Sequence, residues 1–179
     1  MEELSLHILD IAKNSVKANA ELITIKVNED EKKNRLTIEI IDDGCGMSEE
    51  FLKTVKNPFS TTRTTRKVGM GISLFEAAAV QCGGGLEITS KLGEGTTLKA
   101  DFELNSIDRA PLGDIAGTMT VLISGSPHID FVYSHIKNGK EFRMDTKKIR
   151  EILGGVPLDN PEVIGWIDGF INEGIEGLK

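Results

Sequence analysis

Apolar residues at the start of this chain recur with the period of a helix. Over residues 3–18, one face at about 100° per residue collects Leu4, Ile8, Ile11, Ala12 and Ser15. The stripe next to this face is polar and carries Asp10, Asn14 and Lys17. Side chains four residues apart leave the same side of a helix, so a carboxylate and a carboxamide are predicted to lie together beside the apolar face.

Four later segments alternate between apolar and polar residues, as strands with one buried face do. The first two are LITIKV (22–27) and RLTIEIID (35–42), which a charged loop joins. The other two are LEITSKL (86–92) and TTLKADFEL (96–104), which the glycine turn GEG joins. The pattern therefore predicts two pairs of neighbouring strands.

Helical and irregular segments separate the two pairs. Residues 48–56 suit a short helix that begins near Ser48. Residues 69–82 suit a longer helix that glycine opens and that the three glycines at 83–85 end. Residues 57–68, NPFSTTRTTRKV, show no apolar period and are rich in Ser, Thr and Arg, so we expect a mobile loop there.

The C-terminal part predicts further strands and helices. TMTVLISG (118–125) reads as a strand, and Asn138-Gly139 between two alternating segments predicts a hairpin with a type I′ turn. Two helices follow, with Asp145 and Asn160 as their predicted N-caps and Pro161 at the first position of the second helix.

These elements predict an organisation in three parts. Residues 1–104 form one domain, and residues 105–117 have the composition of a linker. Residues 118–179 form a small α+β extension, which either continues the sheet or presents a docking face for a partner.

Composition excludes several classes of protein. The formal net charge of −7 argues against a nucleic-acid surface driven by net charge. No stretch approaches the ~20 apolar residues needed to cross a bilayer, and the acidic start MEELSLHILD lacks the basic region of a signal peptide. Cys45, Cys82 and the histidines show neither metal-ligand nor disulfide spacing. These features are typical of a cytoplasmic protein.

Three glycine-containing motifs accompany the polar stripe: DDGCGM (42–47), GMGIS (69–73) and GEGT (93–96). An acid at the end of a strand can accept a hydrogen bond from an exocyclic amine, and nearby glycines let a flat ligand approach the backbone. Glycines that open a helix leave backbone N–H groups free for a phosphate. Taken singly, each motif is also ordinary turn or surface chemistry. Their order and spacing together need one explanation.

That order resembles the GHKL superfamily, the Bergerat-fold ATP-binding domains of gyrase, heat-shock chaperones, sensor histidine kinases and mismatch-repair ATPases. The resemblance runs from about Glu3 to Leu104. The segments similar to the family's N, G1, F, G2 and final G boxes are HILDIAKNSVKANA, DDGCGM, NPFSTT, VGMGISL and GEGTTL. The resemblance implies an α/β fold, a two-layer sandwich of a mixed, mostly antiparallel sheet with helices on one face. ATP and Mg²⁺ are then expected between the helices and a lid.

The resemblance also implies the roles of individual residues. It makes Asn14 the Mg²⁺ ligand and places Asp42, rather than Asp43, on the adenine amine. Lys17 matches a basic position near the phosphates, and Thr96 matches a residue that supports the adenine-binding acid. The residues implied to line the adenine are Gly44, Gly46 and Met47.

Residues 60–68 match the family's ATP lid. The lid residues implied to contact the triphosphate are Thr61, Thr62, Arg63 and Arg66. Gly69 and Gly71 would free backbone N–H donors for the β and γ phosphates. The other residues implied to bind the nucleotide in this box are Met70, Ile72 and Ser73.

Asp10 departs from the family pattern. Hydrolytic members and anti-sigma-factor-type serine kinases carry a glutamate general base at this place, one turn before the asparagine, and the aspartate arm is one methylene shorter. One interpretation makes Asp10 the catalytic residue, which orients a water or a protein hydroxyl for attack on the γ-phosphate. The other limits Asp10 to binding Mg²⁺ through water or to capping a local hydrogen-bond network.

The resemblance implies an ATP-dependent enzyme that stands alone. The sequence begins at the N box without a two-helix phosphoacceptor domain, and residues 105–179 are too short for the transducer domain of gyrase. His7 is expected to flank the site rather than to accept phosphate. We therefore expect phosphotransfer to a separate regulatory protein, in the manner of anti-sigma-factor serine kinases. The alternatives are an ATP-gated switch with slow hydrolysis in a larger assembly, and a nucleotide-binding subunit without turnover. A homodimer is compatible with each, and no nucleic-acid or membrane partner is expected.

Overall fold

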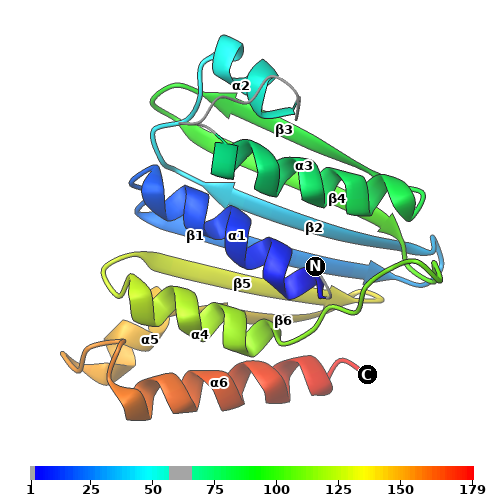
Figure 1. The fold of residues 1–179 in the computed structure, drawn as a ribbon. Coiled ribbons are helices and arrows are strands. Elements are labelled where there is room, and N and C mark those ends of the chain that lie inside the picture. Colours follow the sequence, from blue (N-terminus) through cyan, green and yellow to red (C-terminus); the bar gives the residue numbers. More distant parts are fainter. Residues whose placement is uncertain (1–2, 57–65) are drawn as a thin grey trace.

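A computed structural model describes residues 3–56 and 66–179, and in this part of the chain the strands form one six-stranded sheet (Figure 1). The strand order is β3-β4-β2-β1-β5-β6, and each neighbouring pair is antiparallel except β1 and β5, which are parallel. The strands are β1 (Leu22–Asp30), β2 (Arg35–Asp42), β3 (Gly85–Lys91), β4 (Gly95–Glu103), β5 (Asp130–Lys137) and β6 (Lys140–Asp145). The predicted mixed, mostly antiparallel sheet is thus confirmed.

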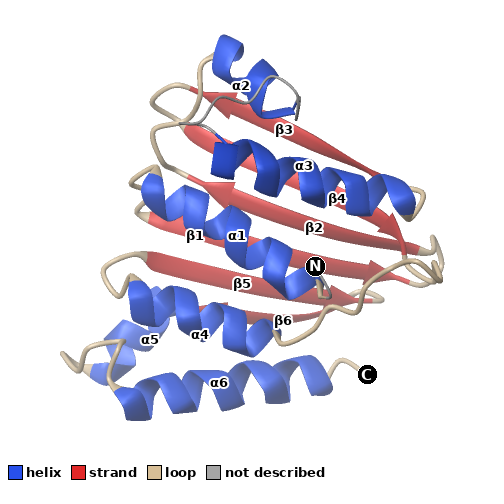
Figure 2. Ribbon diagram, viewed as in Figure 1, coloured by secondary structure: helices blue, strands red, loops and turns tan. Residues whose placement is uncertain are grey.

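Helices cover one face of this sheet (Figure 2). The described helices are α1 (Leu4–Lys17), α2 (Glu49–Lys56), α3 (Arg66–Gln81), α4 (Ile115–Gly125), α5 (Thr146–Leu153) and α6 (Pro161–Glu176). Helix α1 packs between α3 and α4, and α6 packs beside α4. The result is the predicted two-layer sandwich. No helix in the described ranges combines the length and the apolar composition that crossing a bilayer requires.

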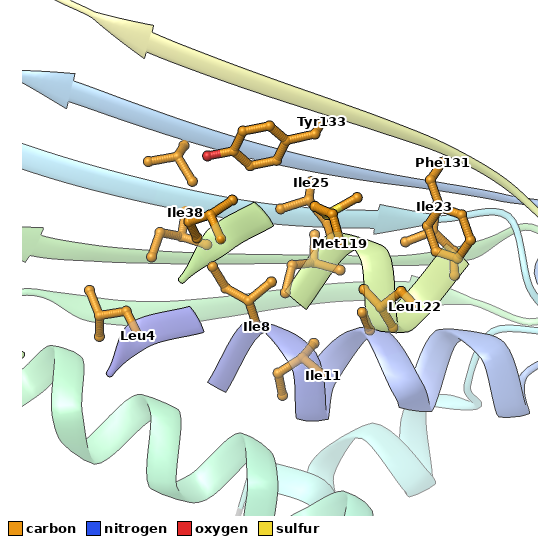
Figure 3. Packing of buried hydrophobic residues seen from close by; sticks show 14 of the residues in the cluster. Leu4, Ile8, Ile11, Ile23, Ile25, Ile38, Met119, Leu122, Phe131 and Tyr133 are labelled. Carbon is orange, nitrogen blue, oxygen red and sulfur yellow. The ribbon is translucent and has the colours of Figure 1, made fainter. Parts of the chain in front are cut away.

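The predicted alternation in the strands and the apolar face of α1 build the core. Ile23, Ile25 and Val27 of β1 are fully buried, while the residues between them are partly exposed. In Figure 3, Leu4, Ile8 and Ile11 reach from α1 toward the sheet, beside Met119 and Leu122 of α4. All five residues predicted for the apolar face of α1, Ser15 included, are buried.

The predicted strand over residues 118–125 is wrong, because these residues belong to α4. Asp114 caps this helix, and its side chain accepts a hydrogen bond of 2.9 Å from the backbone N–H of Gly117. The helix lies between α1, α6 and the sheet, and it buries residues on several sides: Ile115, Ala116, Thr118, Met119, Thr120, Leu122 and Ile123. A short helix buried on several sides shows no helical period, so its apolar run cannot be told from a strand by pattern alone.

The predicted start of α3 is also wrong. This helix begins at Arg66 rather than at Gly69, so residues 66–68, which were expected to belong to a loop, belong to the helix. Because the backbone N–H groups without intrahelical partners belong to the first turn, Gly71 lies too far into the helix to offer one. A first turn with few apolar residues gives no periodic signal, which is why its boundary was misplaced.

The C-terminal elements continue the sheet and hold the start of α1. Strand β5 runs parallel to β1, and Asn138 and Gly139 both have positive φ, as the predicted turn requires. The backbone N–H groups of Leu4 and Ser5 donate to the carbonyl oxygens of residues 111 and 112 at 2.9 and 2.8 Å. Donors that the first turn of a helix leaves unpaired are thus satisfied by the segment before α4.

A buried hydrogen-bonded chain joins β1 to β5. His135 Nε2 lies 2.7 Å from Glu29 Oε2, and His135 Nδ1 lies 2.7 Å from the hydroxyl of Tyr133. The hydrogen bond from His135 lowers the pKa of Glu29, and burial raises the pKa of Tyr133 well above its usual value. The chain therefore favours the ionised carboxylate of Glu29 in the folded state.

This pairing predicts a pH-dependent contribution to stability. A carboxyl group whose pKa is lowered by folding stabilises the folded state at pH values above its ordinary pKa. This stabilisation is lost as the pH falls through the pKa of the folded state. Glu29→Gln should lower the free energy of unfolding by about 1 kcal/mol near neutral pH, and this loss should shrink toward about pH 3. Urea unfolding at both pH values measures it, with Glu31→Gln on the same hairpin as the control. A loss of equal size at both pH values would contradict the assignment.

The turn between α3 and β3 predicts a second stability effect. A Cβ on Gly84 would lie 1.7 Å from the carbonyl oxygen of Asp101 in β4, whereas a Cβ on Gly85 would meet nothing within 4 Å. Gly84→Ala should destabilise the protein by about 1–3 kcal/mol, as overpacking does, and Gly85→Ala should not. Thermal unfolding of the two variants compares them, and equal melting temperatures would show that the turn at Gly84 does not approach β4 as described.

Candidate functional site

A cavity of about 220 Å³ lies over the end of β2, between the sheet and the helices α1, α2 and α3. We call it the nucleotide cavity, after the ligand that the sequence implies. Its apolar lining consists of Ile11, Ala18, Ile40, Met47, Phe51, Ile72, Ile88 and Leu98, and its remaining lining of Asn14, Ser15, Lys17, Asp42, Cys45, Gly46 and Thr96. Predicted site residues from α1, β2, α3 and β4 thus meet in one hollow, which has the mostly apolar walls and few polar groups of a small-molecule site.

Asp42 and Asp43 have different surroundings. The hydroxyl of Ser15 donates to Asp42 Oδ2 at 2.6 Å, and the backbone N–H of Gly44 donates to Asp42 Oδ1 at 2.9 Å. Asp43 instead accepts the backbone N–H groups of Glu21 and Leu22 at 2.8 and 3.0 Å. Asp42 lines the nucleotide cavity and Asp43 does not, which agrees with the choice of Asp42 as the acid that contacts a ligand.

The glycines after Asp42 allow close approaches of the backbone. Gly46 has φ +70°, and a Cβ there would lie 2.1 Å from the carbonyl oxygen of Lys91. A Cβ on Gly44 would lie 2.8 Å from the carbonyl oxygen of Ala18. Both positions therefore need glycine for the loop to close on its neighbours. Only Gly46 lines the nucleotide cavity, so Gly44 shapes the loop from behind.

Thr96 belongs to a polar row across the sheet. Asp42 of β2 lies opposite Thr96 of β4, which lies opposite Ser90 of β3. The hydroxyls of Ser90 and Thr96 are 2.8 Å apart, and the backbone N–H of Met47 donates to Ser90 Oγ at 2.8 Å. Ser90 thus ties the loop that follows Asp42 to the strand that carries Thr96.

A second cavity, of about 440 Å³, opens between α1 and the start of α3, and we call it the phosphate cavity. Its lining residues are Asp10, Lys13, Asn14, Lys17, Met70, Gly71 and Leu74. Because Asn14 and Lys17 line both cavities, the two hollows adjoin. Asp10 is exposed and makes no hydrogen bond or ion pair with any residue that the structure describes.

The donor set of the phosphate cavity fits Mg²⁺ that arrives with a nucleotide. Asn14 supplies a carboxamide oxygen and Asp10, one turn away, supplies a carboxylate, and Mg²⁺ prefers oxygen ligands. Over the described ranges, no group of three or more His, Cys, Asp or Glu residues is placed to hold a metal ion. The described residues therefore offer few ligands of their own, and a bound Mg²⁺ would need phosphates and waters to complete its shell.

The remaining predicted residues contribute less to the two cavities, or lie outside the described structure. Ser73 lines neither, and its buried hydroxyl has no partner among the described residues. Gly71 lines the phosphate cavity, but a Cβ there would meet nothing within 4 Å in the described structure. Gly69 lies inside α3. Thr61, Thr62 and Arg63 lie outside the described residues, as does the side chain of Arg66.

Sequence reasoning missed Ser15, Ser90 and Lys13. Ser15 was assigned to the apolar face of α1, although a buried serine beside a predicted ligand residue signals a hydrogen-bonding role. Ser90 could have been found by counting residues outward from the turn at 93–95, because the hairpin pairs Ser90 with Thr96. Lys13 precedes Asn14 on the exposed side of α1 and carried no signal of its own.

Proteins with related sequences include several sensor kinases. A putative sensor protein of Shewanella frigidimarina is 36% identical over 76 residues, which cover 42% of this chain and 12% of that protein. The peroxide stress-activated histidine kinase mak2 of Schizosaccharomyces pombe is 32% identical over 113 residues, which cover 56% of this chain and 5% of that protein. The chain thus spans only a small part of the length of these curated relatives.

Solved structures share the fold at low sequence identity. The N-terminal domain of a DNA repair protein matches with a TM-score of 0.53 and 15% identity, covering 81% of this chain and 53% of that one. The MutL ATPase domain of Aquifex aeolicus, complexed with ADP, matches with a TM-score of 0.51 and 13% identity, covering 86% of this chain and 70% of that one. At these identities the likeness concerns the fold alone.

One family model matches residues 2–106, and its description is histidine kinase-, DNA gyrase B- and HSP90-like ATPase. The matched region includes α1, the loop after β2, α3 and the turn before Thr96, which together carry the predicted nucleotide contacts. The fold likeness to the MutL ATPase domain extends beyond this region, because it covers 86% of the chain. Since the match spans more than half of its residues, the chain belongs to this family of histidine kinase-, DNA gyrase B- and HSP90-like ATPase domains.

Proposed function

We propose that the chain binds ATP with Mg²⁺ across the two adjoining cavities and transfers the γ-phosphate to a separate regulatory protein. One observation carries this proposal. The exposed carboxylate of Asp10, which pairs with none of the described residues, lies in the phosphate cavity together with Asn14 and Lys17, and there it would meet a hydroxyl from another molecule. This reaction needs cellular ATP, so we place it in the cytoplasm.

The nucleotide cavity supports the adenine end of this proposal. Its apolar walls suit a flat ring, and the carboxylate of Asp42 offers an acceptor for an exocyclic amine. Ser15 and Gly44 already hold this carboxylate in place, so binding needs little further ordering of the side chain.

The phosphate cavity supports the reacting end. Lys17 supplies a cation beside the triphosphate, and Asn14 an oxygen for Mg²⁺ without adding a charge. Phosphoryl transfer depends mainly on positioning and on electrostatic stabilisation. A carboxylate that orients the attacking hydroxyl contributes to the positioning. Asp10 is exposed and bonds to none of the described residues, whereas Ser15 and Gly44 hold Asp42 in the other cavity.

The relative named as a histidine kinase, mak2, supports phosphotransfer over simple hydrolysis. Histidine kinases act on protein partners, and a partner for this chain follows only from that analogy.

An ATP-gated conformational switch with slow hydrolysis is the second candidate. The observation that favours it is the attachment of α1, whose first N–H groups bind residues 111 and 112 and whose Ser5 carbonyl accepts a hydrogen bond of 3.1 Å from Thr118. A shift of α1 on nucleotide binding would therefore bear directly on α4. A nucleotide-binding subunit without turnover is the remaining alternative.

Purified protein incubated with γ-labelled ATP, with and without a cell extract, separates these functions. The proposed kinase places label on another protein. Free phosphate without labelled protein supports the switch and contradicts the kinase. Tight nucleotide binding with neither product supports the third function, a nucleotide-binding subunit without turnover.

Asp42 should determine ATP affinity. Asp42→Asn keeps the size of the side chain but replaces a carboxylate oxygen that accepts the adenine amine, so ATP should bind about 10- to 100-fold more weakly. Titration calorimetry measures the affinity. Asp43→Asn is the matched control, because its side-chain oxygen can still accept the two backbone N–H groups, and it should bind ATP as the parent does. Equal affinities of all three proteins would exclude the proposed adenine contact.

Asp10 should determine turnover but not binding. Asp10→Asn removes the proton acceptor and leaves a side chain of the same size, so phosphotransfer or hydrolysis should fall about 100-fold or more while ATP affinity stays within about threefold. Single-turnover measurements with saturating enzyme separate the chemical step from binding. Unchanged turnover in this variant would remove Asp10 from the mechanism and favour the interpretation in which it binds Mg²⁺ through water.

A further inference from the structure

Helix α6 lies at the outer side of the helix layer, away from the nucleotide and phosphate cavities (Figure 1). It packs against α4 and against β6, the strand at the end of the sheet. Val163, Ile167 and Ile171 form its buried face. Beside this face lies Trp166, the only tryptophan of the chain, which is 54% exposed. Tryptophan is enriched among the residues that dominate binding between proteins, so its exposure here needs an explanation.

The ring of Trp166 is ordered by its neighbours. It stacks on Phe170 with the ring centroids 5.0 Å apart and the ring planes 8° apart. Phe170 in turn packs edge-on against Phe142 of β6, with the centroids 5.1 Å apart. No Lys or Arg among the described residues contacts the indole. Trp166 therefore presents an ordered aromatic surface, and a ligand that binds to it has little side-chain freedom left to restrict.

The flank of α6 that carries Trp166 is acidic. At 100° per residue, Glu162 and Glu173 lie within about 40° of Trp166 around the helix axis. Both side chains are exposed, and their carboxylates form no hydrogen bond or ion pair with any described residue. Helix α6 contains no Lys or Arg. An acid near the C-terminal end of a helix opposes the helix dipole, so the stability of α6 does not explain Glu173.

An ordered indole between two unpaired carboxylates has the chemistry to bind a guanidinium group. A cation over an aromatic face is attracted by the ring, and tryptophan is the best of the aromatic side chains in this respect. Arginine is planar, so it can stack on the indole while its N–H groups donate to a carboxylate. A second copy of α6 is a poor occupant, because it would bring acidic side chains against acidic side chains.

The spacing of the two carboxylates indicates the length of the ligand. Glu162 and Glu173 are separated by about 16 Å along the axis, at 1.5 Å per residue. An extended segment of about five residues spans this distance.

We propose that the outer flank of α6 docks a short basic segment of a protein partner, with one arginine of the segment stacked on Trp166 and paired with Glu162. A second basic side chain of the same segment pairs with Glu173. The surface is separate from both cavities of the candidate site, which no residue of α6 lines. The inference does not depend on ATP binding or on phosphotransfer.

A phage library of short random peptides tests this surface. The library is first depleted on Trp166→Leu, which keeps an apolar side chain but removes the indole, and the unbound phage are then selected on the unaltered protein. We expect the enriched peptides to contain an arginine and a second basic residue within about five positions of it. Enriched peptides that lack basic residues, or no enrichment over a parallel selection on Trp166→Leu, would overturn the proposal.

Synthetic forms of an enriched peptide connect its binding to the named residues. Citrulline in place of the arginine has nearly the same shape but no charge, and it should weaken binding about 10-fold or more. Glu162→Gln should weaken binding about 2- to 5-fold. Glu87→Gln is the matched control, because it removes the same charge from an exposed position on β3, at the other edge of the sheet, and it should bind as the parent does.

The fluorescence of Trp166 follows these titrations directly, because the chain has no other tryptophan. Binding of the arginine peptide should change this fluorescence. Equal affinities for the arginine and citrulline peptides, equal affinities of the two glutamine variants, or binding that leaves the fluorescence unchanged would each contradict the proposed contact.

Discussion

The register of β2, β4 and β3 is the constraint on which the candidate site depends. Asp42, Thr96 and Ser90 form one row across the sheet because their strands pair at these positions. A slip of one residue would turn every side chain of a strand to the opposite face. Ile40 lies two residues before Asp42, and Leu98 lies two residues after Thr96; they pair with each other and share the face of the row. Both are buried and would have to leave the core after such a slip. The burial of these apolar residues therefore fixes the strand register, and with it the position of the polar row.

Helix α1 connects this row to the rest of the molecule. Its apolar face packs on the sheet, its buried Ser15 holds Asp42, and its polar stripe reaches both the nucleotide cavity and the phosphate cavity. Its first turn is bound by residues 111 and 112. One helix thus contacts Asp42 of the nucleotide cavity, carries Asn14 of the phosphate cavity and binds the segment that leads into α4.

Much of this arrangement could be predicted from the sequence, because the strands expose one face and α1 has a polar stripe beside an apolar one. The choice of Asp42 over Asp43 also agrees with their surroundings. The failures have physical causes. Helix α4 is buried on several sides and lacks a period, and the first turn of α3 contributes few apolar residues. The roles of Ser15 and Ser90 depend on which residues meet across helix and sheet, which no local pattern contains.

The central claim is that the acid at the end of β2 recognises the exocyclic amine of adenine, in a cavity whose walls are otherwise apolar. The most direct test compares the affinity of the unaltered protein for ATP and for purine riboside triphosphate, which differs from ATP only by the missing amine. Titration calorimetry of both nucleotides with Mg²⁺ provides the comparison. The account predicts that ATP binds about 10-fold tighter or more, since the analogue leaves the carboxylate without its donor. Equal affinities would contradict it.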